Sequence, residues 1–285
     1  MILETQTTFI NCPYCRSGKY SRWAEELGFF AVRCSDCALI YVNPRPVLES
    51  IDAAVRTGSH GEGAHQLNVV AKPSAVKVGR YRKIFRRFFD DVWRGGKPIS
   101  WLDVGAGYGE IVEAVTELAH AESKIEGLEP MHPKAAYAAS RGLTITEDYL
   151  RPTHPKVQYV SIVDVFSHIP DFEAFLLDLK SVLEPGGEIF LETGNLADLE
   201  SRDEFPGELG LPDHLVFAGQ IQLCGFIENA GFQIVRIEKI RVDGIVNLIK
   251  NLVKKIIGRP VMLCLPYTSK YRQLLIRARL KNPTS

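Results

Sequence analysis

Three glycines at alternate positions follow a short apolar segment in WLDVGAGYGE, the sequence of residues 101–110. Glycines in such a loop allow the backbone to approach a ligand closely. The spacing of Gly105, Gly107 and Gly109 differs from the dinucleotide-binding pattern, whose third glycine follows the second by three residues. A phosphate-binding P-loop is excluded because no Lys-Ser or Lys-Thr pair follows. The loop is therefore expected to bind neither a dinucleotide nor a nucleoside triphosphate.

Two acidic residues flank this loop and narrow the choice of ligand. Asp103 lies inside the apolar segment, where a carboxylate would repel a pyrophosphate but would suit an ammonium group. Glu129 ends the next apolar segment, in GLEP, where a carboxylate can accept hydrogen bonds from both ribose hydroxyls of a nucleoside. A nucleoside without phosphates and with an ammonium-bearing tail fits both acids. The sequence thus favours S-adenosylmethionine as the ligand.

Four of the six cysteines form two matched pairs, CPYC and CSDC, separated by eighteen residues. Cys12, Cys15, Cys34 and Cys37 have the spacing of a tetrahedral zinc site. Strand-like segments follow each pair, which predicts a zinc ribbon whose folding free energy comes from the metal. Chance cysteines and a redox dithiol fit this spacing less well. Basic and acidic residues are mixed here, so a structural or substrate-shaping role is favoured over nucleic-acid binding.

The elements that must position these residues alternate along the chain. We predict strands at 99–104, 124–128, 143–146, 159–165, 188–192 and 232–240, and helices at 110–120, 133–140, 172–183 and 219–230. This alternation predicts an α/β fold, a Rossmann-like doubly wound sheet whose ligands bind beyond the carboxyl ends of the strands. Apolar residues spaced along 81–93 predict one core-packing helix, and 59–65 a polar loop with two solvated histidines.

The ordered series DVGAGYG, GLEP, VDVFSHIPDF and LEPGGEIFLET resembles the class I S-adenosylmethionine-dependent methyltransferases over about residues 101–240. With the ribbon in front, the chain is similar to the members encoded with polysaccharide and deoxysugar biosynthesis genes. The resemblance implies a ribbon at 1–45, a linker and helical cap at 46–97, and a methyltransferase domain at 98–285.

The same resemblance assigns the cofactor-binding residues. It implies that the backbone of the loop approaches the cofactor, that Asp103 reaches the methionine moiety, and that Glu129 holds the ribose. Asp164 falls near the sulfonium methyl, with a loop or helix-cap acid as the alternative. The implied loop residues are Gly105, Ala106, Gly107 and Gly109, and the candidates for the adenine edge are Thr146, Glu147 and Asp148.

Methyl transfer is an in-line displacement, so alignment supplies much of the catalysis and a base is needed only if the acceptor loses a proton. His168 is the first candidate base, and His214, within the insert 195–218 where a substrate lid would lie, is the second. For both, a capping or packing role is the alternative. Ser167 replaces the acid usual in the family before the histidine. The segment DVFS lacks the Asn/Asp-Pro-Pro-aromatic element of methyltransferases that act on nucleobase amines.

Residues 269–281 alternate between apolar and basic side chains and resemble the antiparallel last strand of this fold. The preceding residues 243–268 form an insertion with a basic amphipathic helix. Such a helix can lie on an anionic membrane, which would suit a lipid-linked glycan precursor as acceptor. Packing of the helix on the domain is the favoured alternative.

Lys and Arg balance Asp and Glu at 34 each, which disfavours a nucleic-acid partner. Without a recognisable signal peptide or membrane-spanning segment, the chain is predicted to be cytoplasmic, with a peripheral location at the inner membrane face as an option. The favoured acceptor is a nucleotide-sugar or glycan precursor. The alternatives are an O- or N-methyltransferase of a quinone-like or other secondary metabolite, a zinc-ribbon RNA methyltransferase, and a non-catalytic binding protein.

Overall fold

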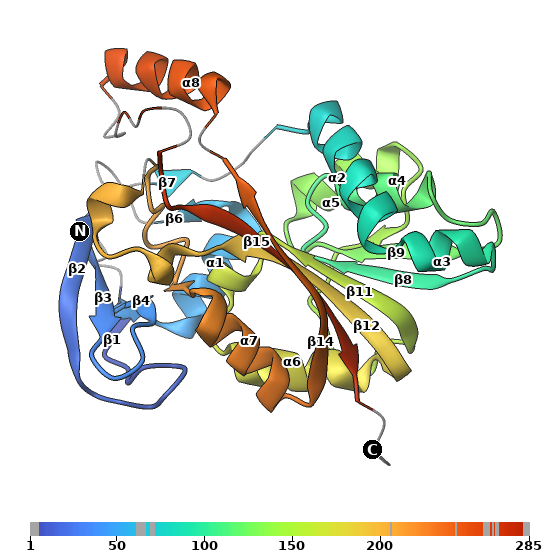
Figure 1. The fold of residues 1–285 in the computed structure, drawn as a ribbon, viewed down its shortest axis with the longest axis horizontal. Coiled ribbons are helices and arrows are strands. Elements are labelled where there is room, and N and C mark those ends of the chain that lie inside the picture. The colour runs from blue at the N-terminus through green and yellow to red at the C-terminus, as the bar shows by residue number, and fades with distance from the viewer. Residues whose placement is uncertain are drawn as a thin grey trace.

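A seven-stranded sheet in the order β10-β9-β8-β11-β12-β15-β14 forms the centre of the molecule (Figure 1). The structure is a computed structural model that describes residues 6–60, 67–68, 72–205, 207–242, 244–258, 263, 265 and 268–281. Strands β10 to β12 in this order are parallel, and β15 is antiparallel to both of its neighbours. The strands are β8 (Ser100–Val104), β9 (Lys124–Leu128), β10 (Ile145–Thr146), β11 (Val157–Val163), β12 (Leu183–Gly194), β14 (Phe232–Arg241) and β15 (Arg272–Leu280). The predicted Rossmann-like α/β fold is confirmed.

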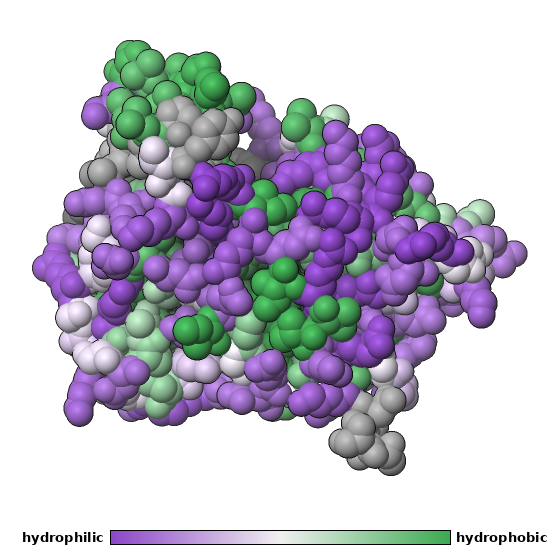
Figure 2. All heavy atoms as spheres, in the orientation of Figure 1, coloured by the Kyte–Doolittle hydropathy of each residue, from purple (hydrophilic) through white to green (hydrophobic). Residues whose placement is uncertain are grey.

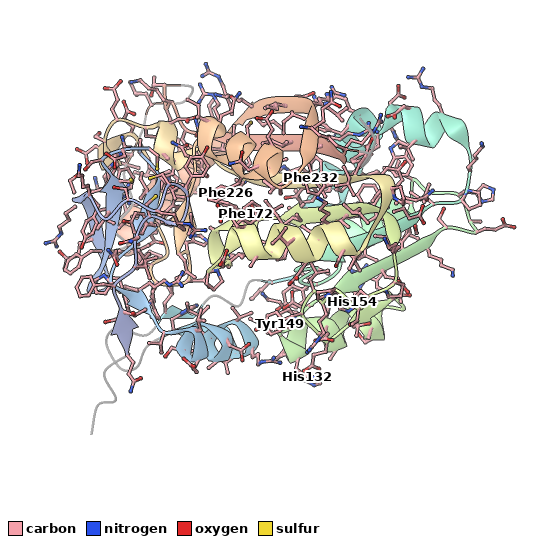
Figure 3. All side chains as sticks on the ribbon, turned by 90° about the horizontal axis from the view of Figure 1, so that it is seen from below. His132, Tyr149, His154, Phe172, Phe226 and Phe232 are labelled. Atoms are coloured by element: carbon pink, nitrogen blue, oxygen red, sulfur yellow. The ribbon has the colours of Figure 1, made fainter. Side chains whose placement is uncertain are left out.

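Helices cover both faces of this sheet because successive strand residues point to opposite sides. In β8, Trp101 packs with Phe85 and Phe89, whereas Leu102 packs in the separate core below α6 and α7. Figure 3 shows Phe172 and Phe226 where α6 and α7 meet, with ring centroids 5.5 Å apart. The helices are α2 (Ala75–Phe88), α3 (Asp90–Gly95) and α4 (Glu110–Thr116) on one face, α6 (Phe172–Ser181) and α7 (Gln220–Asn229) on the other, and α5 (His132–Ser140) beside β10.

The single helix predicted at 81–93 is two helices, α2 and α3. Helix α2 begins earlier, at Ala75, where the Ser74 side chain accepts a hydrogen bond from the Lys77 N–H. Phe89 interrupts the helix with a ψ of 31° and packs its ring on Trp101. The apolar periodicity continues across this break, so the pattern alone could not reveal it.

The N-terminal ribbon is joined to the rest of the chain by a shared sheet. Its strands β2 (Tyr20–Glu26), β3 (Phe29–Cys34) and β4 (Ile40–Val42) are extended by β13 (Val216–Phe217), and β1 (Thr7–Thr8) pairs with β5 (Arg45–Pro46). Strand β13 belongs to the insert 195–218, which also contains the short helices η3 (Leu196–Asp198) and η4 (Arg202–Glu204). Leu196, Leu209 and Leu211 of the insert share a core with Ile40 and Val42. The segment expected as a substrate lid is therefore packed on the ribbon.

Helix α1 (Leu48–Thr57) follows the ribbon and is succeeded by β6 (Ser59–His60), which pairs with β7 (Leu67–Asn68). The expected polar loop at 59–65 therefore begins as a strand. His60 is only 6% exposed, so the prediction that it is solvated is wrong. His65 lies outside the described residues.

Helix α8 (Ile245–Ile256) occupies the predicted amphipathic insertion, and β15 is the predicted antiparallel last strand. The favoured expectation that α8 packs its apolar side on the domain is wrong, because Ile245, Ile249 and Ile256 are 58%, 57% and 76% exposed. Within the described ranges, no helix has the length and apolar character that crossing a membrane requires.

Candidate active site

A cavity of about 570 Å³ opens at the carboxyl ends of β8, β9 and β11. This is the edge at which open α/β sheets bind their ligands. The glycine loop lines one part of the cavity, and apolar residues of α1, Leu48, Ile51 and Val55, line another. Tyr149, labelled in Figure 3, also lines it. The Arg56 guanidinium of α1 lies over the Tyr149 ring, 4.9 Å from its centroid. Helix α1, which belongs to the predicted linker and cap at 46–97, thus forms one side of the cavity.

The glycine loop crosses the end of β9, where the N–H groups of Gly105 and Ala106 both donate to the Leu128 carbonyl. Gly105 has a φ of 74°, and a Cβ there would lie 2.4 Å from Val165. Gly109 has a φ of 85°, and a Cβ there would lie 2.4 Å from Leu143. Both glycines are therefore required by backbone conformation and packing, whatever the ligand. Gly105, Ala106 and Gly107 line the cavity, but Gly109 does not.

Glu129 stands at the cavity end of β9, as predicted. Its Oε2 accepts a 2.7 Å hydrogen bond from the Gly107 N–H, and its Oε1 accepts one of 2.9 Å from the Met131 N–H. The side chain is buried yet lines the cavity. Two backbone donors hold this carboxylate in one orientation at the ligand-facing edge.

Asp103 does not reach the cavity, contrary to prediction. Its side chain is 1% exposed and accepts a hydrogen bond from Ser161, the residue directly opposite on β11. Burial, together with the nearby charges of Glu129 and Glu110, raises the pKa of Asp103 to about 8. This environment favours the uncharged acid, so Asp103 is poorly suited to pair with an ammonium. Asp103 lies inside strand β8, one residue before Val104, which is the first residue of this strand to line the cavity. This position explains why its carboxylate does not reach the ligand site.

The three residues proposed for the adenine edge are separated by the structure. Thr146 and Glu147 do not line the cavity, and Glu147 instead pairs with His132 at the surface. Asp148 does line it, and Arg151 beside it holds the pKa of the Asp148 carboxyl below its usual value. Of these three candidates, only Asp148 remains in position to meet a ligand.

Asp164 lines the cavity at the end of β11, and the helix-cap alternative does not apply. The residue has a left-handed φ of 56°, and its Oδ1 accepts a 3.0 Å hydrogen bond from Gln273 of β15. The carboxylate is exposed rather than engaged at a helix N-terminus. Asp164 is thus a loop acid that faces the cavity, and its placement beside the reacting end of a ligand stays a prediction.

Both predicted histidines line the cavity, and Asp213 connects His168 to His60. The Nδ1 atom of His168 lies 3.0 Å from the Asp213 carbonyl oxygen and 3.2 Å from its Oδ1. The Nε2 atom of His60 lies 2.9 Å from the same Oδ1. His168 ends η2 (Phe166–His168), and the His214 ring lies 4.7 Å from the His168 ring. The insert thus brings a carboxylate and a second imidazole to the histidine that follows β11.

The local electrostatics distinguish the two histidines. Burial is the largest influence on His168 and disfavours its charged form, but the hydrogen bonds to Asp213 and the negative charge of that carboxylate together raise the pKa of His168 above its ordinary value. Burial and the neighbouring His168 lower the pKa of His214 to about 4. Burial opposes ionisation of Asp213, yet the hydrogen bonds from His168 and His60 hold its pKa well below the usual value. Asp213 is therefore an anion that supports His168.

His168, Asp213 and His214 also offer ligand atoms within 4.8 Å of one another, a separation that a metal ion could bridge. The Asp213 Oδ1, however, already contacts nitrogens of both His168 and His60. We therefore interpret the cluster as a hydrogen-bonded network and assign no metal to it.

The four cysteines of the ribbon meet at one point. The Sγ atoms of Cys12 and Cys37 are 3.5 Å apart, as are those of Cys15 and Cys34, and all four lie within 4.8 Å of one another. A tetrahedral zinc with Zn–S bonds of about 2.3 Å separates its sulfurs by about 3.8 Å. The arrangement fits such an ion, and none of the four forms a disulfide.

Sequence reasoning did not identify Asp213 or His60 as site residues. The acid beside His214 in LPDHL was the available signal for Asp213, since an acid and a histidine often act together. No local pattern marks His60, which is 153 residues from its partner.

Known proteins resemble this chain in sequence and fold. Residues 77–237 match the family model described as Methyltransferase domain. The ubiquinone biosynthesis O-methyltransferase of Aeromonas salmonicida is 26% identical over 151 residues, 48% of this chain and 63% of the relative. That of Haemophilus ducreyi is 32% identical over 114 residues, 35% and 46% of the two chains. The chain thus spans less than two thirds of the length of either relative.

Solved structures extend the similarity to the fold. The cyclopropane synthase MmaA2 from Mycobacterium tuberculosis has a TM-score of 0.51 and 13% identity, covering 68% of this chain and 84% of its own. An O-methyltransferase from a trans-AT polyketide synthase multienzyme of Brevibacillus brevis, in complex with S-adenosyl-L-homocysteine, has a TM-score of 0.50 and 14% identity, covering 73% of each chain. At these identities the similarity is evidence of fold alone.

Proposed function

Since the chain belongs to the methyltransferase domain family, we propose that it transfers the methyl group of S-adenosylmethionine to a hydroxyl of a small, largely apolar acceptor. A phenol-like or quinone-like molecule is the acceptor class that fits best. One observation carries this proposal: His168, supported by Asp213, lines an apolar cavity at the carboxyl edge of the sheet. The curated relatives, named ubiquinone biosynthesis O-methyltransferases, fit the same acceptor class.

The residues at the cavity fit the proposed cofactor. Glu129 would accept hydrogen bonds from the ribose, and the backbone of Gly105 and Gly107 would line the methionine moiety. Met131 and Leu150 supply apolar surface suited to the adenine. When bound, S-adenosylmethionine supplies an electrophilic methyl carbon attached to a positively charged sulfur.

We propose His168 as the general base and Asp213 as the group that orients it. Because the Nδ1 of His168 donates to Asp213, the Nε2 carries the lone pair that can accept the proton of an acceptor hydroxyl. A base works best when its pKa is near the working pH, which favours His168 over His214. His214 stays neutral and can hydrogen-bond the acceptor.

The charges around the cavity argue against the nucleotide-sugar acceptor that the sequence favoured. Among the described residues, the basic side chains that line the cavity, apart from histidines, are those of Lys77 and Lys134. The acidic lining residues are Asp52, Glu110, Glu129, Asp148, Asp164 and Asp213. A diphosphate would meet mostly negative charge, whereas a neutral apolar acceptor would not.

Product analysis tests the acceptor class. We expect that incubation with S-adenosylmethionine and a panel of catechols and hydroquinones gives products heavier by one methylene, seen by mass spectrometry. Nucleotide-sugars in the same assay should remain unmodified. Methylation of nucleotide-sugars alone would overturn the acceptor class, and no methylation with retained cofactor binding would favour a non-catalytic protein.

Substituting Glu129→Gln should weaken cofactor binding by about 10- to 100-fold, since hydrogen bonds to a charged group are lost. Calorimetric titration with S-adenosylhomocysteine measures this change. Glu147→Gln is the matched control, because Glu147 pairs with His132 at the surface, away from the cavity lining. Equal dissociation constants for the two variants would show that Glu129 is not a cofactor ligand.

We further propose that Cys12, Cys15, Cys34 and Cys37 bind a structural zinc ion. The ion would hold the ribbon, and the ribbon in turn holds the insert. Glu26 of the ribbon accepts hydrogen bonds from the N–H groups of Leu209 and Gly210, a few residues before Asp213. We therefore propose that zinc takes no part in the reaction and instead stabilises the ribbon, which positions the insert that carries Asp213 and His214.

A further inference from the structure

Helix α8 presents an apolar surface to the solvent. Figure 1 shows the helix projecting from the rest of the molecule, and Figure 2 shows hydrophobic side chains gathered over it. Each of the following residues is about half exposed or more: Ile245, Val246, Ile249, Leu252, Val253, Ile256 and Ile257. An isolated exposed leucine is ordinary, but a contiguous patch of this kind indicates a binding surface.

The partly covered residues of α8 mark the other side of the helix. Leu248, Asn251 and Lys254 are three residues apart and are each partly buried. Residues at this spacing lie along one side of a helix. Two of these three residues are polar. The partly buried side of α8 is therefore mainly polar, and its apolar side faces the solvent. This is the reverse of the orientation expected for a helix that packs on a core.

Cations border the exposed apolar strip, and acids are absent from the whole segment. At the helical period, Lys250 and Lys255 lie on opposite flanks of the apolar residues. Residues 244–285 contain nine Lys and Arg and no Asp or Glu, whereas the remaining chain has 25 basic and 34 acidic residues. Lysines can extend from such flanks to anionic headgroups while the apolar strip enters the acyl boundary. An apolar strip with cations on both flanks and no acid nearby complements the surface of an anionic bilayer.

The position of α8 connects this surface to the cavity. The helix follows the carboxyl end of β14, where Arg241 pairs with Arg272 of β15. The next residue of β15, Gln273, pairs with Gly194 at the end of β12 and donates a hydrogen bond to Asp164. Since Asp164 lines the cavity, α8 leaves the sheet at the same edge at which the cavity opens.

We propose that α8 docks this protein on an anionic lipid bilayer, lying in the interface with its apolar strip inserted. A helix of 12 residues is about 18 Å long, which suits the interfacial plane but not a crossing of the bilayer. Docking turns the cavity edge of the sheet toward the bilayer, in which an apolar acceptor dissolves. This delivery of the acceptor rests on the proposed function, whereas docking itself does not.

Co-sedimentation of the full chain with vesicles tests the docking. We expect binding to phosphatidylcholine vesicles that contain phosphatidylglycerol, and little binding to pure phosphatidylcholine. Lys250→Gln and Lys255→Gln together should weaken binding by about 25-fold, since each lysine near an anionic surface contributes about fivefold. Ile249→Ser with Ile256→Ser should also abolish binding, and circular dichroism should show unchanged melting because both side chains are exposed.

The matched control removes the same charge from the opposite edge of the sheet. Lys97 is exposed before β8 and Lys124 is exposed at the start of β9, and substitution of both by Gln should leave vesicle binding unchanged. Equal loss in this control would show nonspecific charge attraction and overturn the proposal. So would no vesicle binding by the wild type. Concentration-dependent dimers that Ile249→Ser dissociates, without vesicle binding, would assign the strip to a second copy instead.

Two acceptors separate this inference from the proposed function. A water-soluble catechol should be methylated equally by the wild type and the lysine variant. A long-chain hydroquinone held in anionic vesicles should be methylated faster by the wild type. Turnover of the soluble acceptor without vesicle binding would refute membrane docking and leave the proposed methyltransferase function intact. Vesicle binding without turnover of either acceptor would support docking and refute the proposed function.

Discussion

Replacement of His168 by Gln is expected to lower kcat/KM for the acceptor by about 10²- to 10⁴-fold, the usual contribution of a positioned general base. Glutamine can fill the space and keep a hydrogen bond to Asp213, but it cannot accept the hydroxyl proton. Cofactor affinity should be unchanged, because His168 lies in the segment after β11 whereas Glu129 and the glycine loop lie at β8 and β9. Steady-state kinetics together with calorimetric titration separate the two effects.

His120→Gln is the matched control for this variant. His120 is exposed in the loop before β9, at the opposite edge of the sheet, and its substitution should leave kcat/KM unaltered. Retention of full activity by His168→Gln would remove His168 as the base and direct attention to His214.

The pH profile gives an independent test of the same assignment. The base must be neutral to accept a proton. Burial lowers the pKa of His168, but the hydrogen bonds and the negative charge of Asp213 together raise it above its ordinary value. Activity should therefore rise with pH through this raised pKa. Asp213→Asn removes the anion that stabilises the imidazolium, so the rising limb should move to lower pH while the maximum rate falls. An unmoved limb would contradict the pairing.

Loss of zinc is expected to disorder the ribbon and, with it, the acceptor end of the site. Structural zinc contributes an apparent binding free energy of about 10–16 kcal/mol in small zinc domains, which is as large as the whole stability of a typical domain. Strand β4 of the ribbon pairs with β13, and the Val42 N–H donates to the Leu215 carbonyl next to His214. We expect one zinc per chain by elemental analysis, and a large fall in acceptor kcat/KM for Cys34→Ser.

Cofactor affinity should survive this loss better than turnover, because Glu129 and the glycine loop belong to the parallel sheet rather than to the ribbon. Cys224→Ser is the matched control, since Cys224 is a half-buried free thiol of α7 outside the four-cysteine group. A Cys34→Ser protein that lacks zinc yet keeps its melting temperature and turnover would refute the proposed role.

Local patterns predicted the sheet well because strand and helix periodicity are properties of neighbouring residues. Strand β9 begins and ends where predicted, at Lys124 and Leu128, and Glu129 stands at its cavity end. The same local view failed for Asp103, whose partner Ser161 is on another strand. Whether a strand residue faces the ligand or its neighbour depends on sheet register, which the glycine pattern does not encode.

The acceptor end of the site was less predictable, because it is assembled from distant segments. His168 and His214 could be proposed from their motifs, but Asp213 gains its role only when it also meets His60. The expected contact between α8 and the domain failed for a related reason. Amphipathicity shows that a helix has an apolar side, but not what covers that side.

The pairing of β4 with β13 also bears on how the chain is made. Ile40 pairs with Phe217, so the ribbon leaves the ribosome long before the strand that completes its sheet. During that interval β4 is an open edge, a feature that invites association with other chains. Early capture of zinc would keep the nascent ribbon folded while it waits. The ribbon is therefore not an independent domain. Its transfer to another methyltransferase would require transfer of β13 and the flanking insert as well.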